Sequence, residues 1–509
     1  SSFFKSFFRN YNRMGAMTEE DAEEVVEVWL AYGRDQSQVI RSLINNDFTP
    51  QSGISINLKL VAGSTLLPSI LSQMGPDVYI GLGQSDVINY AIRGALVEIE
   101  DMDGFDETLV DFNEAAMMVL GIEDANRDLH YYGLPETQNF QMMFVREDIL
   151  AELNIDIPKT WDDVKAAIPI LQANNMQIAM HNDCKIFLYQ KGGELFADNG
   201  MRINLDSNVA LDAFETMCDM FTMYSFPYKY DFANRFRTGE MPIGFATYTA
   251  TYNQLKVFAT EIEGMWGFYP LPGYEDADGN INNVSVSTVS AIVMITGCED
   301  ERGAWEFMKW HVGAQCQIDY SNEMVAILGP SAKHATANMS ALESMPWTTE
   351  EYEQLALQFN SLASVPNYPG SYIIDRYTKF AFLSAFNDGA NPVTELQKYI
   401  TTINKEITRK RSEFGLETLD YVGQTLAEKR MLQAETELKD VRKSSSYSAS
   451  YDETCNNVEK LIAGYTTEDY ASLLSLADAL EELDSGLFRN VVTYMREAAA
   501  ALKTYEAYK

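Results

Sequence analysis

Three strand–turn–helix units follow one another early in the chain, and this order constrains the fold more than any other feature. Strand-like runs of β-branched and aromatic residues occupy Val25–Tyr32, Gly53–Val61 and the stretch between Gly75 and Gly83. Each run is followed by a polar turn and then by a segment with helical character. Because a crossover helix returns each strand in the same direction, consecutive units of this kind predict a parallel sheet in an α/β fold.

The turns after the first and third strands carry polar side chains suited to a ligand. Arg34 and Asp35 follow the first strand, and Gln84, Ser85 and Asp86 follow the third. At the carboxyl edge of such a sheet, helix N-termini and loop side chains face a crevice. We therefore expect these five residues to contact a ligand, with Ser85 or Asp86 as the N-cap of the third helix. An ordinary solvated connection is the alternative.

Composition limits the class of protein. A chain of 509 residues exceeds one ordinary core, so two or three domains are expected. The 46% hydrophobic and 22% charged content is that of a globular protein. A formal charge of −36 argues against nucleic acid and against an anionic membrane surface as partners. A self-repelling acidic exterior fits a soluble protein, and we expect a monomer.

No metal or cofactor site is predicted. The five cysteines show no C-x-x-C spacing and are expected to be buried apolar residues: Cys184, Cys218, Cys298, Cys316 and Cys455. His181 stands at a strand end with Asn182 and Asp183, but no second histidine lies near it in sequence, so a hydrogen-bonding role is favoured over metal ligation. The acidic run Asp276–Asn280 lacks the last glutamate of an EF-hand and predicts a hairpin turn.

Other candidate ligand-binding residues stand where predicted strands and helices begin or end. They are Glu136, Gln138 and Asn139 in the polar start of an extended stretch, Tyr248 and Thr249 after a strand, Trp266, and Tyr372 with Arg376 before a helix. The tyrosine rings suit stacking on an apolar face, and arginine offers a planar donor fork. For Tyr248 a ring packed in the core is the alternative, and for Arg376 a surface salt bridge.

Four phrases in this order resemble one family. Gly75-Pro76-Asp77, Tyr132–Pro135, Pro158–Trp161 and Pro270–Gly273 are similar to the "G-P-D", "Y-G-L-P", "P-x-T-W" and "P-L-P-G" segments of extracellular solute-binding proteins of ABC importers, in the maltodextrin-binding-like group. Thr160 in the third phrase is also a good N-cap with acids in the following turn. The resemblance extends to about Ser412.

The resemblance implies a two-lobed periplasmic-binding-protein-like fold. Lobe 1 is expected at 25–135 and 292–345, and lobe 2 at 136–291 and 346–411. An N-terminal arm, 1–24, precedes them, and a helical extension, 412–509, follows. Phe3 and Phe7 in the arm have helical spacing, which fits a docked helix or a membrane-contacting arm.

The resemblance also implies the function. A carbohydrate, most simply an oligosaccharide, would bind between the lobes for delivery to an ABC transporter permease. We expect no enzymatic activity and an extracellular location, with tethering through a lipid anchor or an N-terminal segment absent from this chain. Two alternatives remain: a binding protein for peptides or another polar nutrient, and a glycosidase with Glu136 and Asp183 as its carboxylate pair.

Overall fold

The computed structural model describes residues 25–124, 128–466 and 468–508, and these form two compact units. Unit 1 contains the described residues up to Ala179 together with Tyr230–Pro272 and Asn283–Pro366. Unit 2 contains Met180–Lys229, Gly273–Asn282 and the described residues from Asn367 onward. The predicted arm, 1–24, lies outside the described residues.

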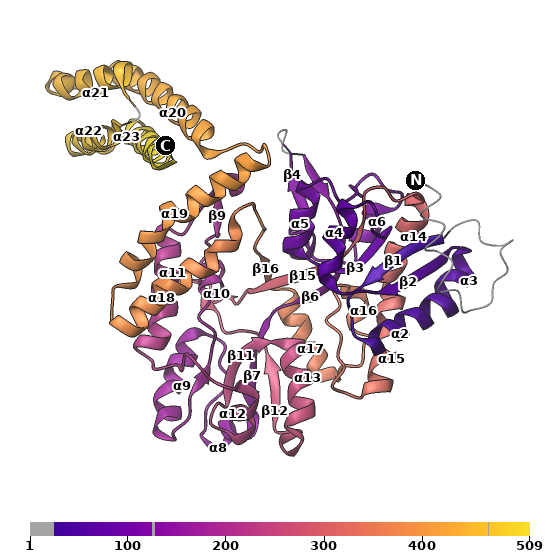
Figure 1. Cartoon of the computed structure of the whole chain (residues 1–509). Coiled ribbons are helices and arrows are strands. Elements are labelled where there is room, and N and C mark those ends of the chain that lie inside the picture. The colour runs from indigo at the N-terminus through magenta and orange to yellow at the C-terminus, as the bar shows by residue number, and fades with distance from the viewer. Residues whose placement is uncertain (1–24, 125–127, 467, 509) are drawn as a thin grey trace. The chain divides into compact units, whose positions relative to one another are not determined.

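The first sheet of unit 1 has the order β16-β15-β3-β1-β2, with β6 also paired to β15 (Figure 1). Its strands are β1 (Val25–Leu30), β2 (Ser55–Leu60), β3 (Val78–Gly83), β6 (Leu134–Asn139), β15 (Ser285–Met294) and β16 (Leu362–Ser364). The three predicted strands are parallel to one another. The sheet as a whole is mixed, because β15 runs antiparallel to β3 and β6.

The helices that follow the three parallel strands β1, β2 and β3 are α2 (Arg34–Leu43), α4 (Leu66–Leu71) and α5 (Gln84–Ile92). The predicted cap of α5 is wrong: Gly83, in extended conformation, is the N-cap, and Ser85 and Asp86 lie exposed in the first turn. The reason is a hydrogen bond between the side chain of Gln84 and the backbone of the neighbouring strand β15. Gln84 Oε1 accepts a hydrogen bond from the Val289 amide at 2.8 Å, which fixes the first helical residue beside β15.

Apolar side chains cover both faces of this sheet. One face is covered by α2, α14 (Glu301–Val312) and α15 (Ala314–Leu328), whose buried rings include Trp305 and Phe307. The aromatic side chains of α14 therefore serve core packing. Of the five cysteines, all are free thiols, and Cys298 alone is partly exposed.

A second sheet in unit 1 has the order β12-β7-β11-β8. Its strands are β7 (Gln141–Arg146), β8 (Ile178–Ala179), β11 (Ile243–Thr247) and β12 (Trp266–Tyr269). The predicted extended stretch that starts with Glu136, Gln138 and Asn139 is divided, because Phe140 separates β6 in the first sheet from β7 in the second. Both sheets belong to unit 1, and the predicted lobe boundaries stay a prediction.

Thr160 begins α9 (Trp161–Ala173) as predicted. Its hydroxyl accepts from the Asp163 amide at 3.1 Å, and Asp163 accepts from the Thr160 amide at 2.9 Å. The other α-helices and strands of unit 1 are α3 (Thr49–Ser52), α6 (Phe105–Leu109), α7 (Glu114–Met118), β4 (Gly121–Glu123), β5 (Leu129–Tyr131), α8 (Glu147–Glu152), α12 (Phe232–Thr238), α13 (Tyr248–Phe258), α16 (Met339–Leu342) and α17 (Thr349–Phe359).

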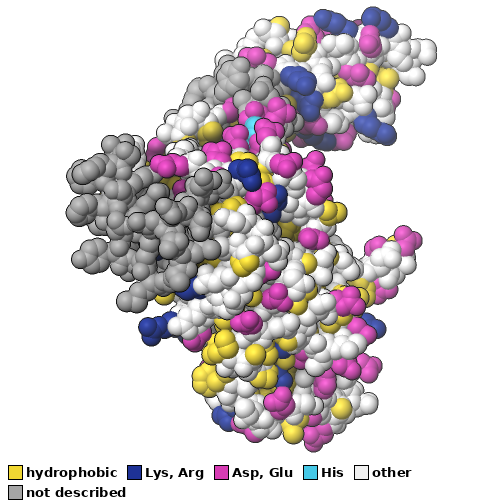
Figure 2. All heavy atoms as spheres, turned by 90° about the vertical axis from the view of Figure 1, so that its right-hand side faces the viewer, with side chains coloured by type: hydrophobic (Ala, Val, Ile, Leu, Met, Phe, Trp, Pro, Cys, Tyr) yellow, Lys and Arg dark blue, Asp and Glu magenta, His cyan; other side chains and the backbone are white. Residues whose placement is uncertain are grey.

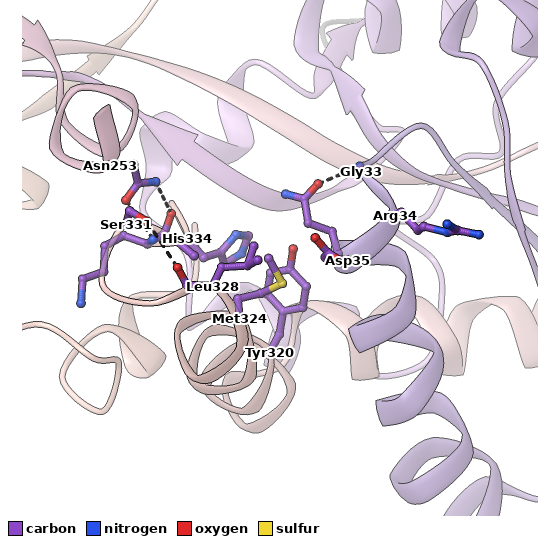
Figure 3. Close-up of a pocket in the computed structure, with 12 residues that line it drawn as sticks. Gly33, Arg34, Asp35, Asn253, Tyr320, Met324, Leu328, Ser331 and His334 are labelled. Atoms are coloured by element: carbon purple, nitrogen blue, oxygen red, sulfur yellow. Dashed lines mark hydrogen bonds between the residues drawn. The ribbon is translucent and has the colours of Figure 1, made fainter. Parts of the chain in front are cut away.

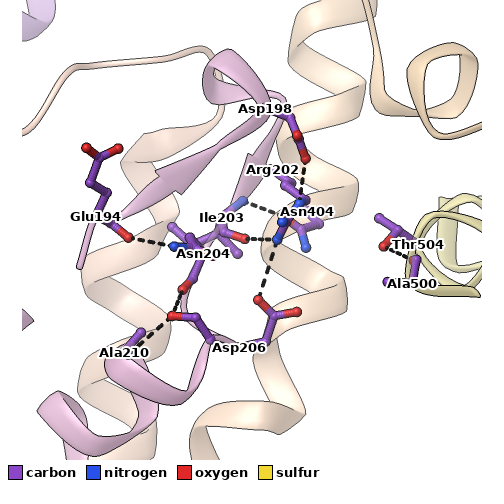
Figure 4. A network of polar contacts seen from close by, with 11 residues as sticks. Glu194, Asp198, Arg202, Ile203, Asn204, Asp206, Ala210, Asn404, Ala500 and Thr504 are labelled. Atoms are coloured by element: carbon purple, nitrogen blue, oxygen red, sulfur yellow. Dashed lines mark hydrogen bonds and ion pairs between the residues drawn. The ribbon is translucent and has the colours of Figure 1, made fainter. Parts of the chain in front are cut away.

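Unit 2 begins with helices and short hairpins. Its elements before the extension are α10 (Lys185–Gln190), β9 (Phe196–Ala197), β10 (Arg202–Ile203), α11 (Asn208–Thr222), β13 (Tyr274–Glu275), β14 (Ile281–Asn282), α18 (Ile374–Asp388) and α19 (Pro392–Glu413). The predicted hairpin at Asp276–Asn280 joins β13 to β14. Figure 4 shows how α19 holds the other hairpin: Asn404 Oδ1 accepts from the Ile203 amide at 2.7 Å.

The predicted C-terminal extension is helical, with α20 (Leu419–Val441), α21 (Asp452–Gly464), α22 (Tyr470–Asp484) and α23 (Arg489–Tyr508). These helices share a core of their own, in which α20 contacts α23. Thr466 is not the N-cap of α22, which begins only at Tyr470. The carboxylate of Asp469 instead accepts from the amide and hydroxyl of Thr466, which holds the turn before the helix.

Acidic side chains are spread over the face shown in Figure 2, with few lysines and arginines among them, as the net charge of −36 requires. Among the helices of the described residues, none has the length and apolar character needed to span a bilayer.

Gly81 provides a test of the packing at the end of β3. It has φ +84°, and a Cβ there would lie 2.6 Å from the Tyr32 hydroxyl. We expect Gly81→Ala to destabilise the protein by about 1–3 kcal/mol more than Gly94→Ala. Gly94 has φ +70° but nothing within 4 Å, so its substitution gives the backbone strain alone. Urea unfolding of both variants measures the difference, and equal losses would contradict the close contact with Tyr32.

Candidate functional site

A pocket of about 290 Å³ lies within unit 1, where the start of α2 faces α15 and the loop after it (Figure 3). It is lined by Gly33, Arg34, Asp35, Gln36, Asn253, Tyr320, Met324, Leu328, Ser331, Ala332, Lys333 and His334. The pocket therefore combines the carboxyl end of β1, where the sequence predicts ligand contacts, with a helix and loop about 300 residues later in the chain.

Arg34 and Asp35 are the predicted residues that the pocket includes. Both are exposed in the first turn of α2, whose N-cap is Gly33. The Gly33 amide donates to Gln36 Oε1 at 2.8 Å, so the side chain of Gln36 in the first turn caps the start of its own helix. Figure 3 shows Arg34 directed away from the other lining side chains. Asp35 is thus the charged acceptor of this wall, beside the positive end of the helix dipole.

The opposite wall is fixed by Asn253 of α13. Its Nδ2 donates to the Lys333 carbonyl at 3.0 Å, and its Oδ1 accepts from the Lys333 amide at 2.9 Å. The Lys333 ammonium bonds the Pro346 carbonyl and lies 5.2 Å from the centre of the Trp347 ring. Burial lowers the pKa of Lys333 from its ordinary value. The amide of Asn253 and the ammonium of Lys333 therefore position the loop after α15.

His334 and Tyr320 form the inner part of the pocket. His334 Nε2 lies 2.9 Å from Gln317 Oε1, which also accepts from the Thr336 hydroxyl at 2.8 Å. Since that oxygen is an acceptor, Nε2 carries the proton and Nδ1 is left as an acceptor. Burial lowers the pKa of His334 to about 4, so the ring is neutral at pH 7. Tyr320 packs edge-on against it at 4.9 Å.

Glu136 lies buried behind this wall, with 2% of its surface exposed. Its Oε1 accepts from the Tyr32 hydroxyl at 2.6 Å and lies 3.4 Å from His311 Nε2. Burial raises the pKa of Glu136, but its neighbours His311 and Tyr32 hold it below its ordinary value overall. Burial and the Glu136 charge raise the pKa of Tyr32. The carboxylate is thus held by the protein itself.

Gln138, Asn139 and Thr249 are also engaged by neighbours. Gln138 is fully buried and donates to Ser287 Oγ at 3.0 Å, and it exchanges hydrogen bonds with Asn113. The Thr249 hydroxyl donates to Asn139 Oδ1 at 2.7 Å, so the structure brings these two predicted residues together.

The two predicted rings Tyr248, at the start of α13, and Trp266, on β12, pack in the core of unit 1. Tyr248 has no exposed surface and stacks on Phe140 with ring centres 4.6 Å apart. Trp266 is partly buried, 5.5 Å from the ring of Tyr252. In this structure Tyr248 is a core-packing ring, which is the alternative stated for it from the sequence. A contact of Tyr248 or Trp266 with a ligand stays a prediction.

Four predicted residues belong to unit 2. Asp183 accepts from the Lys185 amide at 3.0 Å at the start of α10, beside a partly buried Asn182. Tyr372 is 60% exposed and donates to Glu406, and Arg376 is exposed on α18. Their place at one site with the residues of unit 1 stays a prediction.

Sequence reasoning missed the lining residues contributed from α13, α15 and the loop after it. Tyr320 and His334 lie in segments whose pattern indicates an apolar helix and a turn, and Asn253 lies inside a helix. Their proximity to Asp35 depends on contacts distant in sequence. The one local signal is Gly329-Pro330, which ends α15 beside the pocket.

Residues 45–353 match the model of the bacterial extracellular solute-binding protein family, which is more than half of the chain, and the chain belongs to this family. No curated protein sequence matches it. The solved structures agree on the fold, which is that of two-lobed solute-binding proteins.

One similar structure is the sugar-binding protein MalE of Xanthomonas citri, with TM-score 0.65 and 17% identity, covering 77% of this chain and 100% of that one. Another is MalE of Listeria monocytogenes in complex with maltose, with TM-score 0.62 and 14% identity, covering 76% and 99%. A solute-binding protein of Thermotoga lettingae bound with α-D-tagatose has TM-score 0.57 and 16% identity, covering 76% and 100%.

The low pKa of His334 predicts an acid-sensitive stability. Its folded pKa of about 4 lies below the unfolded value of about 6.5, so between these values the unfolded chain binds the extra proton and stability falls as the pH falls. The loss is on the order of 3 kcal/mol by pH 4. Because Gln keeps a donor for Gln317, His334→Gln should fold and lose less stability over this range, as measured by urea unfolding at each pH.

The matched control is His181→Gln, a histidine exposed in unit 2, which should keep the pH dependence of the unmodified protein. A curve for His334→Gln that coincides with that of the control would show that burial of His334 does not destabilise the folded state in acid.

Proposed function

We propose that the protein captures a carbohydrate outside the cell for delivery to an ABC transporter permease. The observation that carries the proposal is the pocket at the start of α2, which lies at the carboxyl edge of the parallel strands in a chain of the solute-binding family. This is the edge at which open α/β sheets bind ligands.

The chemistry of the pocket suits a sugar. Asp35 and His334 Nδ1 offer acceptors for hydroxyl donors, and Ser331 offers a hydroxyl that serves both ways. Tyr320 and Met324 add an apolar surface on which a sugar face can lie. The volume is close to the lower end of small-molecule pockets, about 300 Å³, and fits one sugar unit held at this place.

The comparisons support the same class. The structures similar in fold include proteins described as binding maltose and α-D-tagatose, and a Listeria monocytogenes protein described in complex with cycloalternan. Closure of two lobes around the sugar would bring in further predicted contacts, which are Gln84, Ser85, Asp86, Asn139, Asn182, Asp183, Thr249, Trp266, Tyr372 and Arg376.

The proposal includes no catalytic role. The glycosidase alternative needs Glu136 as an accessible acid or nucleophile, whereas its carboxylate is buried and bonded to Tyr32. An extracellular location follows the family, and a monomer held at the membrane through a lipid anchor or an N-terminal segment completes the proposed arrangement.

A thermal-shift screen tests the class of ligand. We expect a saturable rise in unfolding temperature with at least one mono- or oligosaccharide, because a ligand that binds only the folded state stabilises it. Peptides and other polar nutrients are included at the same concentrations. If a peptide stabilises the protein in a saturable way and no glycan does, the carbohydrate proposal is wrong and the peptide alternative takes its place.

Asp35→Ala tests the pocket. With the sugar found in the screen, we expect affinity to fall at least tenfold, since a charge-assisted hydrogen bond contributes about 1.5–3 kcal/mol. Asp106→Ala is the matched control, because Asp106 is also an exposed aspartate in the first turn of a helix but does not line the pocket. Calorimetry should show unchanged affinity for the control. Equal affinity for both variants would place the ligand elsewhere.

A further inference from the structure

Outside the pocket, three side chains of unit 1 bring metal-ligating atoms together. Glu98, Glu100 and His130 each offer one atom, and these three atoms all lie within 4.8 Å of one another. The two glutamates flank Ile99, which is fully buried, and the carboxylates of both lie against the ring of His130. His130 lies on β5, whose Tyr131 carbonyl accepts from the Ile99 amide at 3.0 Å.

The two carboxylates converge on one atom of the imidazole. His130 Nδ1 lies 2.5 Å from Glu100 Oε1 and 3.8 Å from Glu98 Oε2. Four donors at about 2.0 Å from a tetrahedral ion lie about 3.3 Å apart. The carboxylates of Glu98 and Glu100 face the single N–H of His130 Nδ1, so the three side chains together carry a net negative charge. Small side-chain movements would make room for a cation between the three ligand atoms.

In each of the three side chains, the polar atom that does not face the proposed ion contacts a neighbouring residue, which orients the side chain. The Tyr132 hydroxyl donates to Glu98 Oε1 at 3.1 Å, and the Tyr131 amide donates to Glu100 Oε2 at 3.0 Å. His130 Nε2 lies 3.5 Å from Asp124 Oδ2. Metal-binding histidines commonly donate their second ring N–H to a carboxylate, and ligating carboxylates are commonly held by a further hydrogen bond.

We propose that Glu98, Glu100 and His130 bind a divalent transition-metal ion, with Zn²⁺ as the matching ion and a water molecule as fourth ligand. One imidazole and two carboxylates form a borderline donor set that suits Zn²⁺ better than Ca²⁺ or Mg²⁺, which take oxygen ligands in larger number. The side chains are 30%, 55% and 20% exposed for His130, Glu98 and Glu100, so the ion has direct access from solvent.

Bound metal would join the β4–β5 hairpin to the segment after α5. The three ligands come from two places about thirty residues apart, and the hairpin pairs Gly121–Glu123 with Leu129–Tyr131. The ion therefore adds a cross-link at the edge of unit 1 that does not involve the pocket, and its binding is independent of the proposed solute.

Titration of the full-length protein with ZnCl₂ after removal of metals with EDTA tests the proposal. We expect one ion bound per chain by calorimetry, with affinity at least tenfold lower in His130→Gln and Glu98→Gln. Each of these changes removes one ligand, and the Glu98→Gln side chain keeps an acceptor for Tyr132. The control His181→Gln removes an exposed histidine from unit 2 and should bind as the unmodified protein does.

Substitution by Co²⁺ gives a spectroscopic readout of geometry. The unmodified protein and the control should show the visible absorption of tetrahedral Co²⁺, and His130→Gln should not. Excess Ca²⁺ should leave the spectrum unchanged. Zn²⁺ binding of equal strength in both ligand variants, no saturable binding in the unmodified protein, or displacement of the metal by Ca²⁺ would each overturn the proposal. Because Glu98 is exposed, its variant tests the site even where His130→Gln fails to fold.

Discussion

The hydrogen bond between Tyr32 and the buried Glu136 carboxylate is the contact on which the arrangement of the pocket depends. It joins the end of β1 to β6, and His311 of α14 lies against the same carboxylate oxygen. A carboxylate in such a place is costly unless it is paired and hydrogen-bonded, so removal of one partner leaves a buried charge. The contact therefore fixes the end of β1, and with it the start of α2, relative to β6.

The backbone of β6 extends the same arrangement to the other wall. The Gln138 amide donates to the Ala335 carbonyl at 3.0 Å, and the Ala337 amide donates to the Glu136 carbonyl at 2.9 Å. The segment that carries His334 is thus bonded directly to the strand that carries Glu136. A pocket whose two walls are held by one strand keeps its shape before a ligand arrives, which reduces the ordering cost of binding.

Much of the fold was predictable because its signals are local. The three βα units, the cap at Thr160 and the helices of the extension follow from periodicity and from capping residues a few positions apart. The cap of α5 was mispredicted because Gln84 is fixed by β15, which lies about 200 residues later in the chain. A local pattern contains no information about such a neighbour.

The lining of the candidate pocket was predicted only in part for the same reason. Arg34 and Asp35 were found because a strand end and a helix start are visible in sequence. Glu136 and Tyr248 have the residue types of ligand contacts, but burial assigns them to the interior here.

The converse holds for His130, which joins two glutamates only after the chain has paired β4 with β5 and set Ile99 beside them. In a chain with a charge of −36, acidic residues are common over the whole sequence, and they attract cations without forming a specific site. Specific metal binding needs ligand atoms of different kinds held at one point. At the proposed site, the second contact of each of the three side chains holds its ligand atom in place.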